Sequence, residues 1–595
     1  MTAPETPFSR IQQRLLAGDL IHASREIDAW LAIAPCDAGA LTAYAFLMRL
    51  RGRFQLAAET LERSLARAPD YAPSLIEMAR LACHEGQRER AQAWYEAAHG
   101  RAPEATEWFD EWHDLLQQMQ RYAQATQVAR RWCNAQPDSA KAWFSLGLSH
   151  QHNDAFAEAM EAYHRAMALD ARYPMLCNNL SALHSSIGDY DTALRICDEA
   201  IRLDPGNALA WTNAANIWCK LCMPGNALIA AERACALSPG YTLALLALSN
   251  ALKELRRFDE ALDAVMRAAR AAPVDPKIQW SLAMLQLLRG DYENGLVNHE
   301  ARWRGSPELA GVPHFREEMR WHGEDLAGKT LFVWDEQGLG DALQFVRFVP
   351  RIAEQVREAG GTLVYCCFAA LLPLFERSVK PYGVPIVAHS AANLPPFDYH
   401  LPVGSLPLML GVRAETLAAP QRYVEPDPAS VARWRATLPQ DGRLKVGLVW
   451  SGSRGHQRNS LRAVPPALYA QALSGLHNVE FYSLQIDGRE EAEAMAAQGL
   501  SVVDRTPELA SFDETVALIS HLDLVITVCT SVAHLSGALG KRTWLLLDVN
   551  PHWVWMLERG DSPWYPTLTL YRQQNYAEWG PVLERVRADL LALTP

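Results

Sequence analysis

The sequence predicts an α-helical solenoid followed by an α/β region with two Rossmann-like lobes. Two observations lead to this fold class. Small residues recur every 34 residues as far as Gly295, and beyond residue 329 short apolar runs alternate with helical stretches. A chain of 595 residues also exceeds the usual size of one domain. We therefore expect a repeat domain over residues 1–305, a connector over 306–328, a first lobe over 329–435 and a second lobe over 440–595.

The repeats are defined by a small residue, a bulky or turn residue three positions earlier, and usually a proline twelve positions later. The small residues are Ala23, Ala57, Ala91, Ala125, Ala159, Ala193, Ala227, Ala261 and Gly295. The prolines are Pro35, Pro69, Pro103, Pro137, Pro205, Pro239 and Pro273. A small residue lets two helices approach closely, and a proline ends the second helix of a pair. The period and these offsets are typical of tetratricopeptide repeats, of which about nine fit. Such a solenoid usually binds a polypeptide in a concave groove.

Asparagines recur within the repeats. Asn179 and Asn213 share one repeat position, and Asn216 and Asn250 share another. An amide both donates and accepts hydrogen bonds, so these residues could hold the backbone of an acceptor protein without reading its side chains. They could equally cap helices or bridge neighbouring repeats, and the pattern alone does not decide between the two.

Composition excludes several classes of protein. A net charge of −12 argues against general binding of nucleic acid. The sequence has no apolar run of the roughly 18 residues that a membrane span needs. Eleven cysteines without a disulfide framework, and a polar start without a signal core, favour the cytoplasm. Cys219 and Cys222 form a C-x-x-C pair, but no second pair has zinc-ligand spacing, so we interpret them as helix thiols and expect no metal site.

Short apolar runs separated by helical stretches predict parallel sheets in the second half. The expected strands are Thr330–Trp334, Thr362–Cys367, Pro385–Val387, Lys445–Trp450, Val479–Leu484, Leu524–Val528 and Thr543–Leu547, with a helix over Ala342–Val356. Two such runs suggest two lobes with a cleft between them. The sequence lacks a complete G-x-G-x-x-G fingerprint and a P-loop, which argues against a dehydrogenase or an ATPase. Its D-x-D, Asp189–Asp191, lies in a repeat turn and does not support a metal-dependent sugar-nucleotide site.

The first candidate site is the turn Gly338–Asp341 between an expected strand and helix. Gly338 and Gly340 permit a tight turn and close approach of a substrate. Asp341 would face the cleft, where a carboxylate can take a proton from an attacking hydroxyl. The alternative is that Asp341 only caps the helix.

Two further segments could bind a diphosphate. The loop 451–462 follows a strand and contains the candidates Ser451, Gly452, Arg458 and Arg462. The guanidinium groups of the two arginines could bind phosphate in a forked geometry. The other segment ends a strand at Val528 and starts a helix near Ser531, so its free N–H groups would attract an anion. The candidates there are Thr530, Ser531 and His534. Their alternatives are a solvated basic loop, helix caps and a core histidine.

Together these segments resemble a GT-B glycosyltransferase of the heptosyltransferase-like kind, from about residue 329 to the end. The shared pieces are Gly338–Asp341, Val449–Gly452, Thr530–Leu535 and Asp561–Pro566. The resemblance implies a GT-B fold, Asp341 as general base, and diphosphate binding by Thr530, Ser531 and His534. Related chains often carry H-x-x-D-x-x-R in the basic loop. This chain has His456, Asn459 and Arg462 there, so an aspartate is replaced and Arg462 is kept.

The architecture also resembles flagellin glycosyltransferases and the O-linked N-acetylglucosamine transferase, in which repeats precede a GT-B region. It implies a cytoplasmic, metal-independent protein O-glycosyltransferase without cofactor, which moves a sugar from a nucleotide-sugar to Ser or Thr of an acceptor protein, with flagellin as one candidate. One alternative is a non-catalytic repeat scaffold. Another is a transferase acting on a lipopolysaccharide-type glycan, which would not need a long peptide groove. The sequence names neither the nucleotide nor the sugar.

Overall fold

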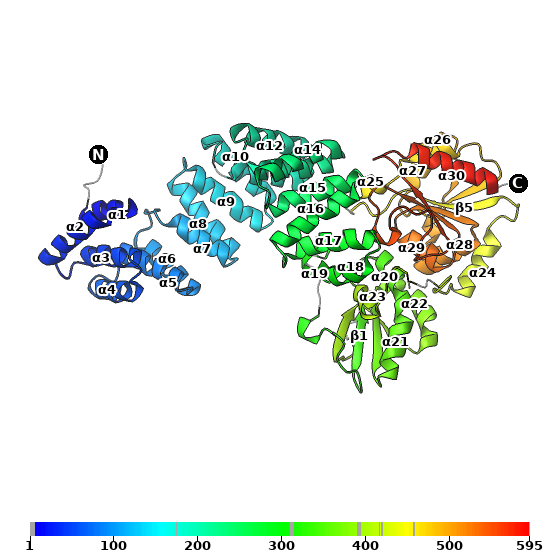
Figure 1. Cartoon of the computed structure of the whole chain (residues 1–595), viewed down its shortest axis with the longest axis horizontal. Coiled ribbons are helices and arrows are strands. Elements are labelled where there is room, and N and C mark those ends of the chain that lie inside the picture. The colour runs from blue at the N-terminus through cyan, green and yellow to red at the C-terminus, as the bar shows by residue number, and fades with distance from the viewer. Residues whose placement is uncertain are drawn as a thin grey trace. The chain divides into compact units, whose positions relative to one another are not determined.

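The computed structural model describes residues 6–173, 175–309, 315–389, 394–415, 417, 420–455 and 458–593. The chain divides into two compact units, Met1–Gly206 and Asn207–Pro595 (Figure 1). The first unit contains only repeat helices. The second contains the last repeats together with two parallel sheets, so the repeats continue across the division between the units.

Pairs of helices build the first unit. They are α1 (Pro7–Leu16), α2 (Leu20–Ile33), α3 (Ala38–Leu50), α4 (Phe54–Arg67), α5 (Ala72–His84), α6 (Arg88–Arg101), α7 (Phe109–Gln118), α8 (Tyr122–Ala135), α9 (Ala140–His152), α10 (Phe156–Leu169), α11 (Leu176–Ser186) and α12 (Tyr190–Leu203). The repeat alanines from Ala23 to Ala193 are all 0% exposed, as expected for residues at the closest approach of two helices.

The repeat prolines lie just beyond the second helix of a pair. For example, α2 ends two residues before Pro35 and α12 ends two residues before Pro205. The fifth repeat has Ala171 in place of proline, and α10 still ends at Leu169. The proline therefore reinforces a helix end that the packing of the next pair also imposes.

The second unit begins with further repeats. Its repeat helices are α13 (Ala208–Lys220), α14 (Pro224–Leu237), α15 (Thr242–Glu254), α16 (Phe258–Ala271), α17 (Pro276–Leu288) and α18 (Tyr292–His299), followed by the short α19 (Arg302–Gly305). Gly295 occupies the ninth small-residue position because a Cβ there would lie 2.8 Å from the Leu287 side chain and 3.0 Å from its backbone nitrogen. This last pair of helices is too close for alanine.

The first sheet is four-stranded and parallel, in the order β3-β2-β1-β4. Its strands are β1 (Thr330–Trp334), β2 (Thr362–Cys367), β3 (Ile386–Ala388) and β4 (Tyr399–Pro402). Its helices are α20 (Leu339–Phe345), α21 (Val349–Glu358), α22 (Leu372–Val379) and α23 (Leu406–Met409).

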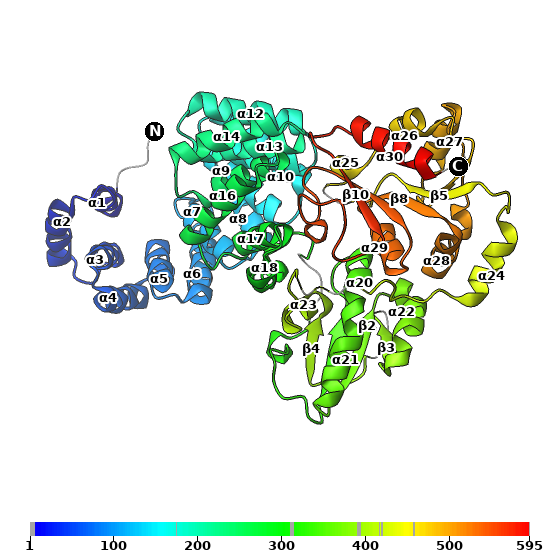
Figure 2. The ribbon, with the colours of Figure 1, turned by 45° about the vertical axis from the view of Figure 1, so that its right-hand side comes forward.

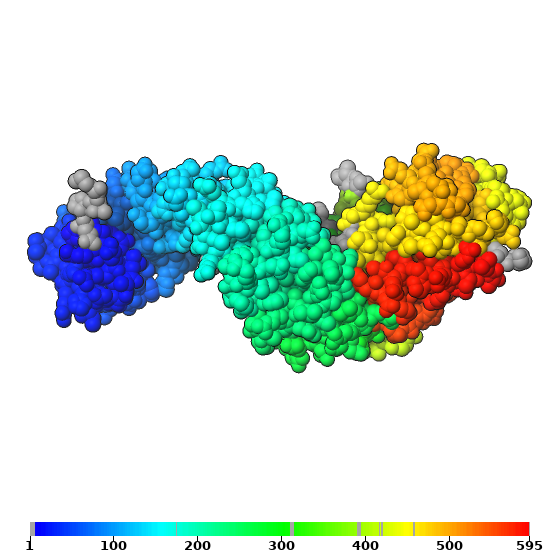
Figure 3. Space-filling view, turned by 90° about the horizontal axis from the view of Figure 1, so that it is seen from above, coloured from blue at the N-terminus to red at the C-terminus, as the bar shows by residue number. Residues whose placement is uncertain are grey.

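The second sheet is six-stranded and parallel, in the order β10-β9-β8-β5-β6-β7 (Figure 2). Its strands are β5 (Leu444–Val449), β6 (Val479–Ser483), β7 (Val502–Val503), β8 (Leu524–Val528), β9 (Thr543–Leu547) and β10 (Leu568–Arg572). Its helices are α24 (Pro428–Thr437), α25 (Asn459–Arg462), α26 (Pro466–Leu473), α27 (Arg489–Ala497), α28 (Phe512–His521), α29 (Ser531–Ala538) and α30 (Gly580–Leu593). Helix α30, coloured red in Figure 3, lies at the surface beside residues coloured yellow.

Both sheets have the strand order of doubly wound folds, in which the first and fourth strands are neighbours and the direction in which successive strands are added to the sheet reverses between them. The predicted fold class, a tetratricopeptide solenoid followed by a parallel α/β region, is therefore confirmed. In such sheets ligands bind beyond the carboxyl ends of the strands at this reversal. The relevant strand pairs are β1 with β4, and β5 with β8.

Three details differ from the sequence-based expectations. The helix expected over Ala342–Val356 begins at Leu339 and is broken by a 3-10 turn at Val346–Phe348, because Pro350 cannot donate to the preceding turn. Strands β4, β7 and β10 were not expected. Helix α24 packs on the second sheet rather than the first, since Trp434 Nε1 donates to Glu514 of α28 at 2.7 Å.

One apolar core joins the last repeats to both sheets. It includes Leu285 and Tyr292 from the repeats, Phe345 from the first sheet, and Trp553 and Trp564 from the second. Because a shared core is broken when one contributor is removed, the last repeats belong structurally to the α/β part of the chain.

Candidate functional site

The loop after β1 presents Asp341 at the start of α20. The Gly338 N–H donates to Asp341 Oδ2 at 3.0 Å, so the carboxylate caps the helix from inside its first turn. Burial raises the pKa of Asp341 to about 6, the Gly338 hydrogen bond opposes that shift, and the charges of Glu308 and Glu336 add to it. Asp341 therefore has a proton affinity suited to a general base near neutral pH as well as a capping role.

The N-terminal turns of α20 and α29 meet between the two sheets (Figure 2). Gly340 lies at the contact. A Cβ at this position would be 3.2 Å from His534 Cδ2 and 3.7 Å from the Ser531 Cα. The turn that carries Asp341 and the turn predicted to bind phosphate are thus brought together, and glycine permits their close approach.

Helix α29 begins directly after β8, with Thr530 as its N-cap. The Thr530 hydroxyl accepts from the Val532 N–H at 3.2 Å, and Ser531 is half-buried next to it. His534 is buried, and its Nδ1 is 2.8 Å from the Tyr565 hydroxyl. Burial lowers the pKa of His534 well below its usual range, so the ring is neutral at pH 7. His534 can offer a hydrogen bond to a ligand there but no positive charge.

The start of the basic loop after β5 is held by side chains. Asn459 Oδ1 accepts from the Gly452 N–H at 2.8 Å, and its Nδ2 donates to Ser451 Oγ at 3.1 Å. The Ser451 N–H donates to Gln485 Oε1 at 3.0 Å. Asn459 thus shapes this turn. His456 lies outside the described residues.

The two loop arginines that were predicted to bind diphosphate differ in their surroundings. Arg458 is paired with Glu254 of α15 and, through Nη2 at 2.8 Å, with Asp548. Its charge is therefore already balanced by carboxylates. Arg462 lies against the Gly452 Cα, where a Cβ would be 2.7 Å from its Cζ, and its buried Nε has no hydrogen-bond partner among the described residues. Of the two, Arg462 is better suited to receive an anion.

The late stretch Asp561–Pro566 forms a structural junction. Trp564 and Tyr565 are fully buried, and Trp564 Nε1 donates to the Tyr292 hydroxyl of α18 at 2.7 Å. The Arg347 guanidinium from the first sheet lies 4.5 Å from the ring centres of both Tyr423 and Tyr565. These aromatic residues join repeats and both sheets, and none of them needs a ligand to explain its burial.

The four candidate acceptor-binding asparagines are distributed over both units. In the first unit, Asn179 is half-buried and its Nδ2 donates to the Tyr163 hydroxyl at 3.4 Å, which bridges neighbouring helices. In the second unit Asn213 is half-buried, whereas Asn216 and Asn250 are exposed. The exposed pair is accessible to a bound polypeptide, and Asn179 fits the bridging alternative.

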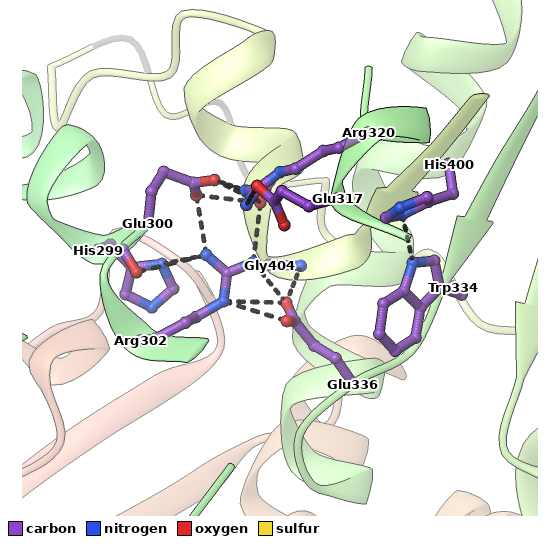
Figure 4. A network of polar contacts seen from close by, with 10 residues as sticks. His299, Glu300, Arg302, Glu317, Arg320, Trp334, Glu336, His400 and Gly404 are labelled. Atoms are coloured by element: carbon purple, nitrogen blue, oxygen red, sulfur yellow. Dashed lines mark hydrogen bonds and ion pairs between the residues drawn. The ribbon is translucent and has the colours of Figure 1, made fainter. Parts of the chain in front are cut away.

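A buried polar network between the end of the repeats and the first sheet was not expected from the sequence (Figure 4). Arg302 of α19 is 0% exposed and pairs at 2.8 Å with Glu336, two residues after β1. Glu336 also accepts from the Gly404 N–H at 2.9 Å, beyond β4. Arg302 also donates to Glu300, which in turn accepts from Arg320. The end of the repeats is thereby fixed to the first sheet at its reversal point. The signal in the sequence was the pair of carboxylates Asp335 and Glu336 in the same turn as Asp341.

The described residues include no cluster of three or more His, Cys, Asp or Glu side chains arranged to hold a metal ion. Cys219 and Cys222 are unpaired thiols, as are the other cysteines, and burial raises the pKa of Cys219 to about 11. Within the described part of the chain, no helix has the length and apolar character needed to span a membrane.

Comparisons with known proteins identify the repeats. Family profiles described as tetratricopeptide repeat match residues 111–174, 176–207 and 246–308, so the chain contains tetratricopeptide repeats. Protein FlbA of Caulobacter vibrioides is 27% identical over 531 residues, which covers 80% of this chain and 88% of that protein. Protein STIP1 homolog of Dictyostelium discoideum is 31% identical over 94 residues, covering 16% of this chain and 17% of its own length.

Solved structures are similar to the repeats over shorter stretches. The APC/C hetero-tetramer Cut9–Hcn1 matches with a TM-score of 0.33 and 16% identity, over 42% of this chain and 49% of that chain. The tetratricopeptide protein YrrB matches with a TM-score of 0.28 and 21% identity, over 32% of this chain and 97% of that chain.

Proposed function

We propose that the chain is a protein O-glycosyltransferase of the GT-B kind, which transfers a sugar from a nucleotide-sugar to Ser or Thr of a protein bound by the repeats. The observation that carries the proposal is the meeting of α20 and α29 at Gly340. It places a carboxylate with a raised pKa, Asp341, beside the helix start at Ser531. A proton acceptor next to an anion-binding turn is what glycosyl transfer from a phosphate requires.

In the proposed reaction Asp341 takes the proton of the acceptor hydroxyl, and the hydroxyl oxygen forms a bond to the anomeric carbon. The bond from that carbon to the phosphate oxygen breaks, and its electron pair leaves with the nucleotide. Arg462 and the first N–H groups of α29 offset the charge that develops on the leaving phosphate. Neutral His534 can donate a hydrogen bond to the same group but adds no charge.

The repeats supply the acceptor site in this proposal. A tetratricopeptide solenoid usually binds polypeptide, and Asn216 and Asn250 present exposed amides from equivalent repeat positions. Flagellin is the candidate acceptor, from the resemblance to flagellin glycosyltransferases. The match to Protein FlbA covers 80% of this chain and therefore extends beyond the repeats into the α/β region. That extent supports a joint function of the two parts.

A non-catalytic scaffold is the second candidate function. It is favoured by the loop after β5, where the Ser451 and Gly452 N–H groups and Arg458 already have protein partners. A transferase that bound its donor mainly through this loop would keep these groups available for phosphate.

Intact-mass analysis of flagellin separates the candidates. Purified flagellin is incubated with the full chain and, in turn, UDP-, GDP-, ADP- and CMP-activated sugars. The transferase predicts a mass increase of one sugar or more with at least one donor, and a far smaller glycosylated fraction after the same time with Asp341→Asn. The scaffold predicts a stable complex with unchanged flagellin mass under every condition, and that result would refute the transferase for this acceptor.

A further inference from the structure

A residue of the repeats reaches the basic loop of the second sheet. Glu254, the last residue of α15, is 7% exposed and accepts from both terminal nitrogens of Arg458, with the Nη2 contact at 3.2 Å. It also accepts from Asn550 Nδ2 at 2.8 Å. Arg458 in turn donates to Asp548 Oδ2 at 2.8 Å, beyond β9. The end of a repeat helix is thus bonded to two loops at the carboxyl edge of the second sheet.

This contact restrains the short helix α25. Arg458 is its N-cap residue, and the Arg458 carbonyl accepts the Arg462 N–H at 3.1 Å. The two arginines are therefore separated by one helical turn of the same short segment. Asn459 fixes the same turn from its other side through Gly452 at 2.8 Å. A shift of the Arg458 backbone would consequently be passed to Arg462 through this turn.

The orientation of Arg462 matters because its positive charge acts at the start of α29 while its guanidinium packs against Gly452. The charge of Arg462 acts on Cys529, the residue before the N-cap of α29, and on Asp548. Its Nε is buried and lacks a hydrogen-bond partner among the described residues. A buried guanidinium nitrogen without a partner is costly unless an anion completes its bonding.

We propose that Glu254 is a positioning residue for donor binding: it holds Arg458, and through it α25, so that Arg462 faces the phosphate of the nucleotide-sugar. The inference rests on the proposed function for the identity of the ligand. The last repeats then do more than present the acceptor, because one of their helices forms part of the support of the donor site. A change at Glu254 alters donor affinity without any contact between Glu254 and the donor.

The test uses Glu254→Gln in the full chain, because Gln keeps the shape and removes the charge. Glu77→Gln is the matched control. Glu77 is also a buried repeat glutamate, 2% exposed, that accepts from two arginines, Arg49 at 2.7 Å and Arg80 at 2.6 Å. It belongs to the first compact unit, whereas both sheets belong to the second. A general weakening of the repeats would affect both variants alike.

The first measurement is hydrogen–deuterium exchange, which requires no ligand. Glu254→Gln should speed exchange at Ser451–Gly455 and in α25, whereas Glu77→Gln should not. The second is calorimetric titration with UDP, GDP, ADP and CMP. For each nucleotide that the natural chain binds, Glu254→Gln should raise Kd roughly tenfold, within the usual range of coupling between linked sites. Glu77→Gln should leave Kd within a factor of about two, since Glu77 shares no partner with Arg458 or α25 and independent sites rarely couple by more than this.

The double variant tests whether the effect passes through Arg458. In an Arg458→Gln background, Glu254→Gln should change the nucleotide Kd little further, because the residue it acts on is already gone. Unchanged exchange in α25, or additive effects in the double variant, would overturn the positioning role. Exchange in α25 could be faster in Glu254→Gln while the natural chain binds none of the four nucleotides. In that case the restraint of α25 by Glu254 would be supported, but its role in donor binding would be refuted together with the proposed function.

Discussion

At the scale of single residues, the capping role of Asp341 and its proposed role as general base make different demands on the side chain. A helix cap needs only an acceptor oxygen, which Asn supplies equally well. A general base needs a group that can hold a proton at the operating pH, and burial raises the pKa of Asp341 to about 6. The same burial makes the charged form costly in the folded state.

We predict that Asp341→Asn lowers transfer by about 10²–10⁴, the usual contribution of general base catalysis. In the natural chain the transfer rate should rise with pH through about 6, as Asp341 loses its proton, and this step should vanish in the variant. A mutant that retained more than about a tenth of the natural rate would leave only the capping role.

Stability gives an independent check on the same residue. The folded-state pKa of Asp341 lies above its ordinary value of 3.8, so the ionised carboxylate reduces stability as pH rises through about 6. Asp341→Asn should therefore melt no lower than the natural chain at pH 7, and its advantage should shrink toward pH 4. A lower melting temperature at pH 7 would contradict this environment for Asp341.

Arg462 and Ser531 allow a second prediction at this scale. Arg462→Ala combined with Ser531→Ala should raise the Kd for the nucleotide diphosphate by roughly 10²-fold, since each lost bond to a charged group contributes about 1.5–3 kcal/mol. Circular dichroism should show unchanged folding. EDTA should not abolish binding to the natural chain, and an absolute requirement for magnesium or manganese would refute the metal-independent mechanism.

The strand-to-helix turns at Gly340 and Ser531 could be predicted from local patterns, and each is the start of a helix in the structure. Their contact could not be derived from one sheet edge, because β1 and β8 belong to different sheets. The state of Arg458 depends on Glu254, which is 204 positions away in the sequence. Local spacing carries no information about a partner at that distance, so the pairing could not be predicted.

At the scale of elements, a strand was predictable where it was long enough to be buried on both faces. β1, β2, β8 and β9 have the predicted bounds, and all but the first residue of β1 and β2 are buried. The missed strands lack this signal. β7 has two residues, β4 contains His400 and Pro402, and β10 carries an exposed Thr569 at the sheet edge. In each case pairing with a neighbour, rather than local preference, makes the strand.

The junction between α19 and the loop after β1 gives a prediction for stability. Arg302→Leu would leave Glu336 buried without its partner, at a cost of about 3–5 kcal/mol. Arg304→Leu is the control, because Arg304 is exposed on the same helix and its loss should cost less than about 0.5 kcal/mol. Thermal and denaturant unfolding of the full chain measure both variants.

Adding Glu336→Gln to Arg302→Leu should restore part of the lost stability, because it removes the uncompensated buried charge. Equal destabilisation by Arg302→Leu and Arg304→Leu would mean that the junction contributes nothing specific. A double variant less stable than Arg302→Leu alone would mean that Glu336 matters for its bond to Gly404 rather than for its charge.

At the scale of the whole molecule, the pattern of repeats and the distribution of contacts place different boundaries. The repeats end near residue 305, whereas the compact units divide at Gly206 and Asn207. A repeat register describes how each helix pair resembles the next. It does not show that Tyr292 and Leu296 complete a core with Trp553 and Trp564. The periodic pattern therefore predicted the repeats well but could not indicate which of them belong with the sheets.

This difference predicts how fragments will behave. The fragment 207–595 keeps Glu254, Arg302 and Tyr292 with their partners, so it should unfold cooperatively and bind nucleotide with the Kd of the full chain. The fragment 305–595 loses all three and exposes the apolar surface that the last repeats cover, so it should melt lower and aggregate. Nucleotide titration, differential scanning calorimetry and light scattering compare the two fragments with the full chain. If 305–595 were as stable and bound nucleotide as tightly as 207–595, the last repeats would be a separable domain that only binds the acceptor. Neither the shared core nor Glu254 would then support the nucleotide site.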